Sequence, residues 1–264
     1  MIAALIDNGS LEPAAHRNLR AIATALTERT GIAVQAVSWK HSDRIPPEAL
    51  DGAPAWTLAP FLRTQISRGE RDFVFIPFFV SAQGAIGSAL RADLDRLRNE
   101  LGTFSATFTD GLAARGVLSR IVVARIRESI VAHALRAPAV VVVDHGGPSA
   151  TSATLRDSLA REIAGGLGAE IGPLAAASME GVHPPLLADQ LRAPGFANAA
   201  VVIAPLFLSP GRHAGSQGDL AQIAAASPAH CHFADLVGTH SLVPDTLAAA
   251  LRDTLSQIPA ESSA

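Results

Sequence analysis

A repeated order of short motifs is the feature of this chain that most constrains its fold. Four motifs of the first half return in the second half in the same order. They are DNGS at 7–10 and DHGG at 144–147, NLR at 18–20 and TLR at 154–156, FIPFFVS at 75–81 and IAPLFLS at 203–209, and FTDGL at 108–112 and FADLV at 233–237. This recurrence predicts two tandem copies of one module. We place them at residues 1–136 and 137–264, with Pro138 as the helix stop between them.

Within each half, short apolar runs alternate with segments of helical periodicity. Strands are expected at 2–7, 32–39, 72–80, 104–110, 139–144, 169–179, 199–208 and 231–237. The clearest helix is expected at 89–102, where Leu90, Leu94, Leu97 and Leu101 share one side. Alternating strands and helices favour an α/β fold. We therefore expect two doubly wound modules, each with a mainly parallel four-stranded sheet flanked by helices.

Composition excludes several classes of protein. The net charge is -3 without a basic block, so nucleic acid is not an expected partner. No apolar run reaches the roughly 18–20 residues of a membrane span, and the first residues lack the features of a signal peptide. We therefore expect a cytoplasmic protein. Its expected oligomeric state is a monomer or a homodimer. The single cysteine, Cys231, cannot form an internal disulfide. No phosphate-binding G-x-x-x-x-G-K-[ST] motif is present, so no nucleotide cofactor is expected.

Three side chains with useful chemistry follow three expected strands of the second half. His145 comes directly after VVVVD, Glu180 after AAASM, and His213 after PLFLSPGR. In open parallel sheets, ligands bind beyond the carboxyl ends of the strands. Two imidazoles and a carboxylate at that edge form a site suited to Co, Ni, Fe(II) or Zn. The same groups can also move protons near neutral pH.

The motifs around these residues carry a family resemblance. DHGGPS at 144–149, SMEGVHPPLL at 178–187 and PLFLSPGRH at 205–213 together resemble the class II tetrapyrrole chelatases, the sirohydrochlorin and cobaltochelatase group. The opening DNGSLEPAAHRNLRAIA is similar to the family's HGS start with its histidine replaced. The resemblance covers nearly the whole chain, as two copies of the family module.

This resemblance implies a function and a set of site residues. Members insert a divalent metal, here Co, Fe or Ni as substrate, into a sirohydrochlorin-type tetrapyrrole without ATP, in cobalamin or siroheme biosynthesis. They use two histidines and a glutamate in the cleft between the modules. His145, His213 and Glu180 are accordingly expected to be both the metal ligands and the catalytic residues. Arg212 and the turn at Gly146, ahead of a helix N-terminus, are expected to bind the substrate's carboxylates.

The two halves differ at the site positions. Aligning them places Asn8, Lys40 and Ala85 where the second half has its two histidines and glutamate. An amide, an ammonium and a methyl group cannot replace those metal ligands, so we expect the first module to be a scaffold with a degenerate site. The second half departs from the family pattern in its GGPS turn and in the spacing of Asp219, which stands six residues after His213.

Alternative interpretations remain for the whole chain and for its other histidines. The protein could be a metal or tetrapyrrole carrier that has lost turnover, or an unrelated α/β hydrolase or phosphate-binding enzyme, although it lacks a G-x-S-x-G motif. His183 could be a fourth ligand or a surface loop residue. His230 and His232 flank Cys231, but strand alternation directs the cysteine to the opposite side, so these three cannot form one ligand set and a structural role is favoured.

Overall fold

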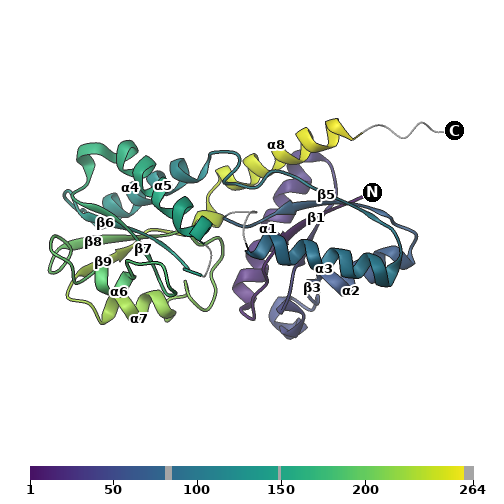
Figure 1. Ribbon diagram of the computed structural model, residues 1–264, viewed down its shortest axis with the longest axis horizontal. Helices are drawn as coiled ribbons and strands as arrows, with labels where there is room; N and C mark the ends of the chain where they lie inside the picture. Colours follow the sequence, from purple (N-terminus) through teal and green to yellow (C-terminus); the bar gives the residue numbers. More distant parts are fainter. Residues whose placement is uncertain (81–84, 148–149, 259–264) are drawn as a thin grey trace. The chain divides into compact units, whose positions relative to one another are not determined.

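The computed structural model describes residues 1–80, 85–147 and 150–258 and divides into two compact units (Figure 1). The first unit consists of Met1–Arg115 together with Ser241–Ala264, and the second of Gly116–His240. Each unit is built around one parallel sheet with helices on both faces. Within the described ranges, no helix is long and apolar enough to cross a membrane.

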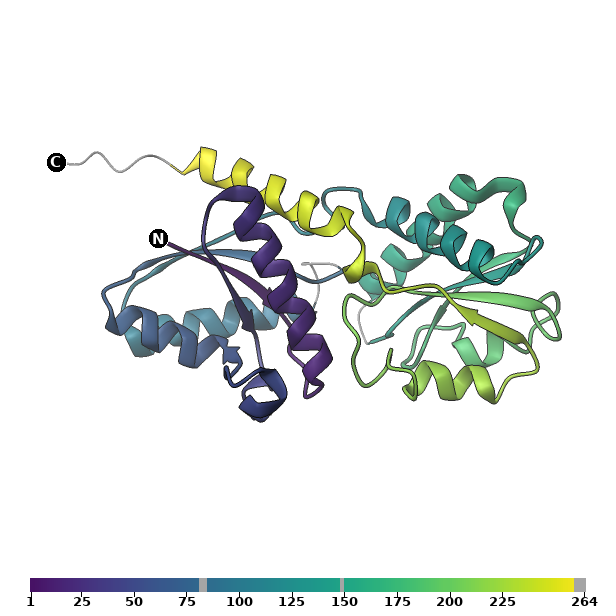
Figure 2. The same cartoon turned by 180° about the vertical axis from the view of Figure 1, so that it is seen from behind.

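The first unit contains a five-stranded sheet in the order β3-β2-β1-β4-β5. Its strands are β1 (Ile2–Asp7), β2 (Val34–Ser38), β3 (Trp56–Thr57), β4 (Asp72–Pro77) and β5 (Ser105–Phe108). Helices α1 (Pro13–Thr30) and α8 (Leu242–Gln257) run alongside each other on one face, and Figure 2 shows them in purple and yellow. Helices α2 (Leu58–Ser67) and α3 (Ala85–Leu101) cover the other face. Two short 3-10 helices, Ser42–Arg44 and Pro47–Leu50, follow β2.

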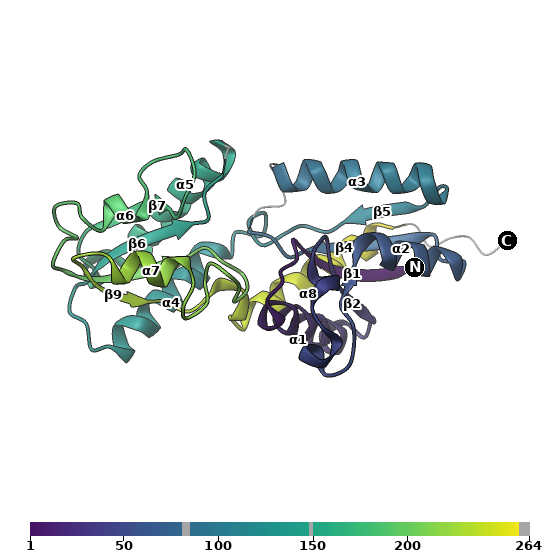
Figure 3. The same cartoon turned by 90° about the horizontal axis from the view of Figure 1, so that it is seen from below.

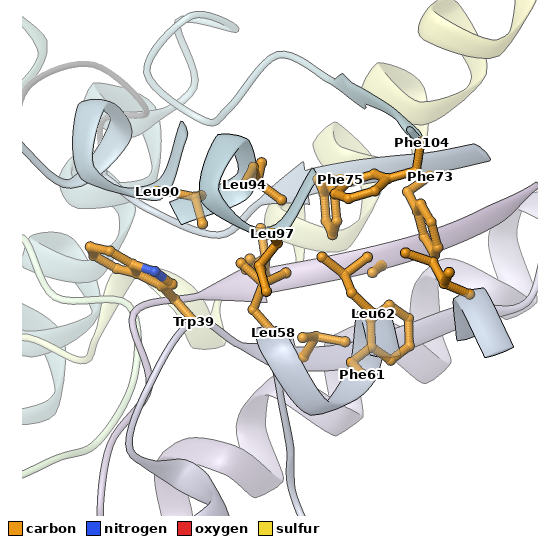
Figure 4. Close-up of a cluster of buried hydrophobic side chains, with 14 of the residues drawn as sticks. Trp39, Leu58, Phe61, Leu62, Phe73, Phe75, Leu90, Leu94, Leu97 and Phe104 are labelled. Carbon is orange, nitrogen blue, oxygen red and sulfur yellow. The ribbon is translucent and has the colours of Figure 1, made fainter. Parts of the chain in front are cut away.

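An aromatic core lies between this sheet and helices α2 and α3 (Figure 4). Phe73 packs edge-to-face against Phe61 and Phe104, with ring centroids 6.3 and 5.8 Å apart. The expected leucine stripe of α3 packs onto the same cluster and is buried at Leu90, Leu94 and Leu97. Because edge-to-face contacts add to the burial of apolar area, this cluster fixes α2 and α3 on the sheet.

The second unit contains a four-stranded parallel sheet in the order β7-β6-β8-β9. Its strands are β6 (Ala139–Asp144), β7 (Leu174–Ser178), β8 (Ala200–Pro205) and β9 (His230–Phe233). Helices α4 (Leu118–Ala132) and α5 (Ala150–Leu167) lie on one face, and the shorter α6 (Leu187–Gln190) and α7 (Asp219–Ala225) lie on the other (Figures 1 and 3). Short 3-10 helices occupy Gly168–Glu170 and Val237–Thr239.

The valine run of β6 shows why this strand is central. All four valines, Val140 to Val143, are fully buried. Val141 and Val143 pack into the cluster beneath α6 and α7, so the alternate pair faces the opposite layer of helices. A continuous apolar run is the pattern of a parallel strand covered on both faces.

The two sheets have the same topology, which confirms the doubly wound α/β prediction. The order β2-β1-β4-β5 in the first unit corresponds to β7-β6-β8-β9 in the second. The four-stranded prediction is correct for the second unit but wrong for the first, which gains the two-residue strand β3 beside β2. In each sheet, the second strand in sequence pairs on one side of the first strand and a later strand pairs on its other side: β2 and β4 flank β1, and β7 and β8 flank β6. The strand order therefore reverses at the carboxyl ends of β1 and β6. Open α/β sheets bind ligands at such a switch point.

The compact units differ from the halves of the sequence repeat. Helix α4 belongs to the first half in sequence but packs against α5 and β8 in the second unit. Helix α8 ends the second half but packs against α1 in the first unit. Each half therefore contributes its closing helix to the other unit, and boundaries at 136 and 137 do not separate the two compact bodies.

Candidate functional site

Strand register brings the first two site residues to one edge of the second sheet. Asp144, the last residue of β6, pairs with Ser178, the last residue of β7. The ladder continues beyond the strands, because Met179 N–H donates to the Asp144 carbonyl at 2.8 Å and Glu180 N–H to the His145 carbonyl at 3.2 Å. His145 and Glu180 therefore leave adjacent strands at the same level.

Gly146 makes this close approach of the two loops possible. Its φ of +81° lies in the left-handed region, and a Cβ at this position would lie 1.8 Å from the carbonyl oxygen of Glu180. Both observations require glycine. Gly146 therefore has a structural role, because it allows the loop of His145 to pack against the loop of Glu180.

The loop after β8 carries the third residue back to the same edge. His213 lies between β8 and α7, and its carbonyl accepts a hydrogen bond of 3.2 Å from Leu220 N–H in the first turn of that helix. A Cβ on Gly218 would lie 2.6 Å from the carbonyl oxygens of both Arg212 and His213, so the loop closes tightly there. This packing fixes the backbone that holds the His213 ring.

The structure brings all three predicted site residues together. The Nε2 atoms of His145 and His213 are 3.2 Å apart, and the rings meet edge to face with centroids 4.6 Å apart. Glu180 Oε1 lies 3.5 Å from His145 Nε2. Residues separated by 68 positions in the sequence thus converge at the switch point of the sheet.

The opposite nitrogen of each ring is held by an oxygen acceptor. His145 Nδ1 lies 2.8 Å from the Gly146 carbonyl, and His213 Nδ1 lies 2.5 Å from Asp219 Oδ2. Both acceptors require Nδ1–H, so each neutral imidazole presents its Nε2 lone pair. Such partners are typical of metal-binding histidines. Two Nε2 atoms that face each other at 3.2 Å can share one cation.

Asp219 contacts His213, although the spacing of the two residues in the sequence did not predict this contact. Six residues separate it from His213, yet the intervening loop folds back so that the carboxylate contacts the ring. Asp219 stands first in α7, directly after Gly218 at the N-cap. The signal in the sequence was an acidic residue at the start of a helix after a glycine-containing loop, where a carboxylate is favoured by the helix dipole.

A buried polar group supports the turn beneath His145. The Asp144 carboxylate accepts a hydrogen bond of 2.8 Å from the Ser178 hydroxyl, and Arg156, which is buried, donates to the same hydroxyl at 2.6 Å. Burial raises the pKa of Asp144, while Ser178, Arg156 and the N–H of Gly146 oppose the rise. Sequence reasoning missed this group, because neither Arg156 nor Ser178 belongs to a recognisable motif.

The site is open. The side chains of His145 and Glu180 are 47% and 60% exposed, whereas that of His213 is 28% exposed. No three His, Cys, Asp or Glu side chains of the described residues form a complete set of metal ligands, so the groups meet in pairs through His145. An open set of this kind leaves coordination positions for a second partner.

The remaining predicted substrate contacts lie nearby or outside the described residues. The Arg212 guanidinium is 81% exposed, and its Nε lies 3.9 Å from Asp219 Oδ2. It is therefore accessible to a ligand. Of the GGPS turn, Pro148 and Ser149 lie outside the described residues. His183 follows Glu180 in a loop that contains the cis peptide bond Pro184–Pro185.

The first unit has the same backbone at this position but different side chains. Lys40 N–H donates to the Asn8 carbonyl at 3.2 Å, as Glu180 does to His145, and a Cβ on Gly9 would lie 1.7 Å from the Lys40 carbonyl oxygen. The Lys40 ammonium lies 3.6 Å from Asp93 and 3.9 Å from the centre of the Trp39 ring. These contacts support the alignment of Asn8 and Lys40. The side chain of Ala85 lies outside the described residues.

Comparisons with solved structures show the same fold over nearly the whole chain. The sirohydrochlorin chelatase SirB of Bacillus subtilis subspecies spizizenii, in complex with cobalt, has a TM-score of 0.66 at 11% identity over 97% of this chain and 96% of that chain. SirB of Bacillus subtilis with Fe3+ gives 0.64 at 11% identity over 96% of each chain. CbiX, the terminal enzyme for biosynthesis of siroheme in denitrifying bacteria, gives 0.65 at 18% identity over 96% and 97%.

Sequence comparison locates the family signal in the half that carries the site. No curated protein sequence matches the chain. The CbiX family model matches residues 139–254, a range that includes His145, Glu180, His213 and Asp219. This match confirms the resemblance to the class II chelatases that the motifs indicated. The second half of the chain is similar to the CbiX family over residues 139–254, and the chain has the fold of the solved chelatases SirB and CbiX.

Proposed function

We propose that this protein inserts a divalent metal ion, Co or Fe, into a sirohydrochlorin-type tetrapyrrole without ATP, in cobalamin or siroheme biosynthesis. The observation that carries the proposal is the pair of Nε2 atoms, 3.2 Å apart, that face each other beside the Glu180 carboxylate. The family match over residues 139–254 supports it. So do the fold neighbours, which include a sirohydrochlorin chelatase in complex with cobalt.

The reaction requires that a divalent ion enter the macrocycle while two pyrrole N–H protons leave. The Nε2 lone pairs of His145 and His213 can bind the metal ion before insertion, with Glu180 as an additional oxygen ligand. The same lone pairs can afterwards accept protons. Because a lone pair cannot hold a proton and a metal ion together, proton uptake weakens the hold on the metal. Proton removal from the macrocycle and metal release from the protein are thereby coupled at the same atoms.

The surroundings of the pair fit this sequence of events. Asp219 holds the His213 ring in the Nδ1–H tautomer and stabilises the imidazolium that forms when Nε2 takes a proton. Exposure of His145 and Glu180 leaves room for a large flat substrate. Arg212 is the accessible cation beside His213 and is proposed to bind a substrate carboxylate.

The proposal is tested by following the absorption spectrum of sirohydrochlorin during metal insertion. The wild-type chain and the variants His145→Ala, His213→Ala and Glu180→Gln are each supplied with Co2+, and separately with Fe2+ under anaerobic conditions. We expect insertion by the wild type, a large loss of rate in both histidine variants and a smaller loss in Glu180→Gln. The rate should be measured against the uncatalysed reaction at the same pH and metal concentration.

The first unit offers a matched control for this experiment. Lys40 occupies the backbone position equivalent to Glu180, so Lys40→Gln makes the same replacement at the degenerate position. We expect Lys40→Gln to insert metal at nearly the wild-type rate. A wild type that does not exceed the uncatalysed rate, or histidine variants as fast as the wild type, would show that this pair does not carry the reaction.

A carrier role is the second candidate, favoured by the replacements in the first unit. Asn8 and Lys40 stand where the second unit has its histidine and glutamate, so only one of the two equivalent positions keeps the ligands. A carrier would bind Co2+ through His145 and His213 and leave sirohydrochlorin unmetallated. Metal binding that is lost in both histidine variants, without product in the wild type, would establish this role in place of insertion.

A further inference from the structure

We propose that the second unit carries an accessory metal site away from the strand ends, formed by the imidazoles of His133 and His232. The two rings contact each other with centroids 4.5 Å apart and planes tilted by 42°. His133 is the C-cap of helix α4, and His232 lies on β9, the edge strand of the second sheet. Neither residue belongs to the cluster around His145, and the inference stands independently of the proposed insertion reaction.

The ring separation is appropriate for a shared ion. The His145–His213 pair at the sheet edge has nearly the same centroid distance, 4.6 Å. Two imidazoles bound to one metal through M–N bonds of about 2.1 Å place their ring centres roughly 4.5–5.3 Å apart at coordination angles from about 90° to the tetrahedral value, so the observed separation suits the smaller angles. The tilt of 42° shows that the two rings are not stacked flat on each other.

Strand alternation concentrates imidazoles on this side of β9. Cys231 points to the other side, where it packs against the apolar cluster beneath α6 and α7. His230 and His232 therefore share the side that faces the end of α4. His230 and His133 are both exposed, and His232 is half-buried between them. The histidines that flank Cys231 cannot join the cysteine in a ligand set, but one of them meets a histidine from another element.

The helix end beside His133 is a favourable position for a cation. The carboxyl end of α4 carries the partial negative charge of the helix dipole, which stabilises a positive ion beside His133. Burial lowers the pKa of His232, and the neighbouring His133 and His230 lower it further.

The chemistry of the pair defines the class of ligand. Imidazole nitrogens suit Ni2+, Cu2+, Zn2+ and Co2+, whereas Ca2+ and Mg2+ require oxygen ligands. Three His, Cys, Asp or Glu side chains do not form a complete ligand set anywhere in the part of the chain that the structure describes. The accessory site accordingly has two protein ligands, with water in the remaining positions, and His230 is the nearest further imidazole on its strand.

The test is a titration of the full chain with Ni2+ at pH 7.5, read as bound equivalents by equilibrium dialysis. The His145→Ala/His213→Ala double variant removes the pair at the strand ends and isolates the accessory site. We expect this background to retain one bound Ni2+ and to lose it when His133→Ala and His232→Ala are added. Each of the latter substitutions alone should also weaken binding, because a two-ligand site needs both imidazoles.

Three controls accompany this titration. His41→Ala in the same background removes another exposed imidazole, which contacts Arg44, and should leave Ni2+ binding unchanged. Circular dichroism shows whether each variant keeps its fold, and His133→Asn provides a polar replacement at the exposed helix end. A background that binds no Ni2+, or binding that survives loss of both His133 and His232, overturns the proposal. Neither result bears on insertion at His145 and His213.

Discussion

Replacing Asp7 with asparagine is expected to stabilise the first unit above neutral pH. Asp7 ends β1 and corresponds to Asp144 at the end of β6, but among the described residues no guanidinium contributes to its environment as Arg156 does to that of Asp144. Its hydrogen-bond partners include the Ser38 hydroxyl and the Gly9 N–H, and the buried ring of His16 lies 3.5 Å from that hydroxyl. Among the described residues, neither Asp7 Oδ1 nor His16 Nε2 has a hydrogen-bond partner. Ionising Asp7 therefore places a poorly compensated charge in the core.

The size of the effect follows from the ionisation of this carboxyl group. Burial raises the pKa of Asp7 from 3.8 to about 6 in the folded protein. Because the folded pKa is raised, the stability linked to this group is fully present below pH 3.8 and is lost as the pH rises through 6. At about 1.36 kcal/mol per pKa unit, the penalty at pH 8 is about 3 kcal/mol, and about half of it develops between pH 5 and pH 8.

The two tryptophans of the chain provide a specific assay. Trp39 and Trp56 both lie in the first unit, and the sequence contains no tyrosine, so intrinsic fluorescence reports the unfolding of this unit. Urea unfolding of the wild type and Asp7→Asn is measured at pH 5 and at pH 8. Burial, with a smaller contribution from Arg20, also lowers the pKa of His16 to about 4, which destabilises the fold as the pH falls. Both proteins share that contribution, so their difference isolates Asp7.

The expected result is a gain in unfolding free energy for Asp7→Asn that is about 1.4 kcal/mol larger at pH 8 than at pH 5. Asp144→Asn is the matched control in the second unit. Arg156, Ser178 and Gly146 oppose the rise in the pKa of Asp144, so its pH-dependent gain should be smaller, and the tryptophan transition should not move. An Asp7→Asn protein with the wild-type pH dependence would refute this account of the buried carboxyl group.

Two further substitutions examine how the site at the second sheet is held. Gly146→Ala places a Cβ 1.8 Å from the Glu180 carbonyl oxygen. We expect this substitution to destabilise the second unit by about 1–3 kcal/mol or more, measured by chemical unfolding followed by circular dichroism. Metal insertion should be lost as well. Gly147→Ala, whose Cβ meets no described atom within 4 Å, should be nearly neutral in both measurements. Asp219→Asn should lower Co2+ affinity by about 10–100-fold in a titration, because the His213 ring loses its charged partner; an unchanged affinity would mean that Asp219 does not orient this ring.

Hydrophobic periodicity predicted the strands that are buried on both faces and the helices that bury one apolar stripe. The expected strands at 2–7 and 139–144 match β1 and β6, because a buried parallel strand requires a continuous apolar run. Strand β3 was missed, since two residues carry no periodic signal and are held only by pairing with β2. Helix α7 was also missed, because only Leu220 and Ala224 along it are buried.

The sequence predicted the positions of those site residues that come directly after a strand. His145 and Glu180 lie within two residues of β6 and β7, so the parallel register alone brings them together. The placement of His213 and Asp219 depends on a loop of irregular backbone, whose closure on Gly218 cannot be calculated from residue spacing. The exchange of α4 and α8 was not visible in sequence, because an apolar helix face fits either of two similar sheets equally well.

The exchanged helices have a consequence for the history of the chain. A single half, cut between residues 136 and 137, would carry a last helix that packs against a different sheet and would leave one face of its own sheet with one helix instead of two. Such a polypeptide could complete that face only by exchanging its last helix with a second molecule. Duplication and fusion of a gene for an intertwined homodimer would leave this arrangement, and would also allow one copy to replace its histidine by Asn8 while the other copy kept His145.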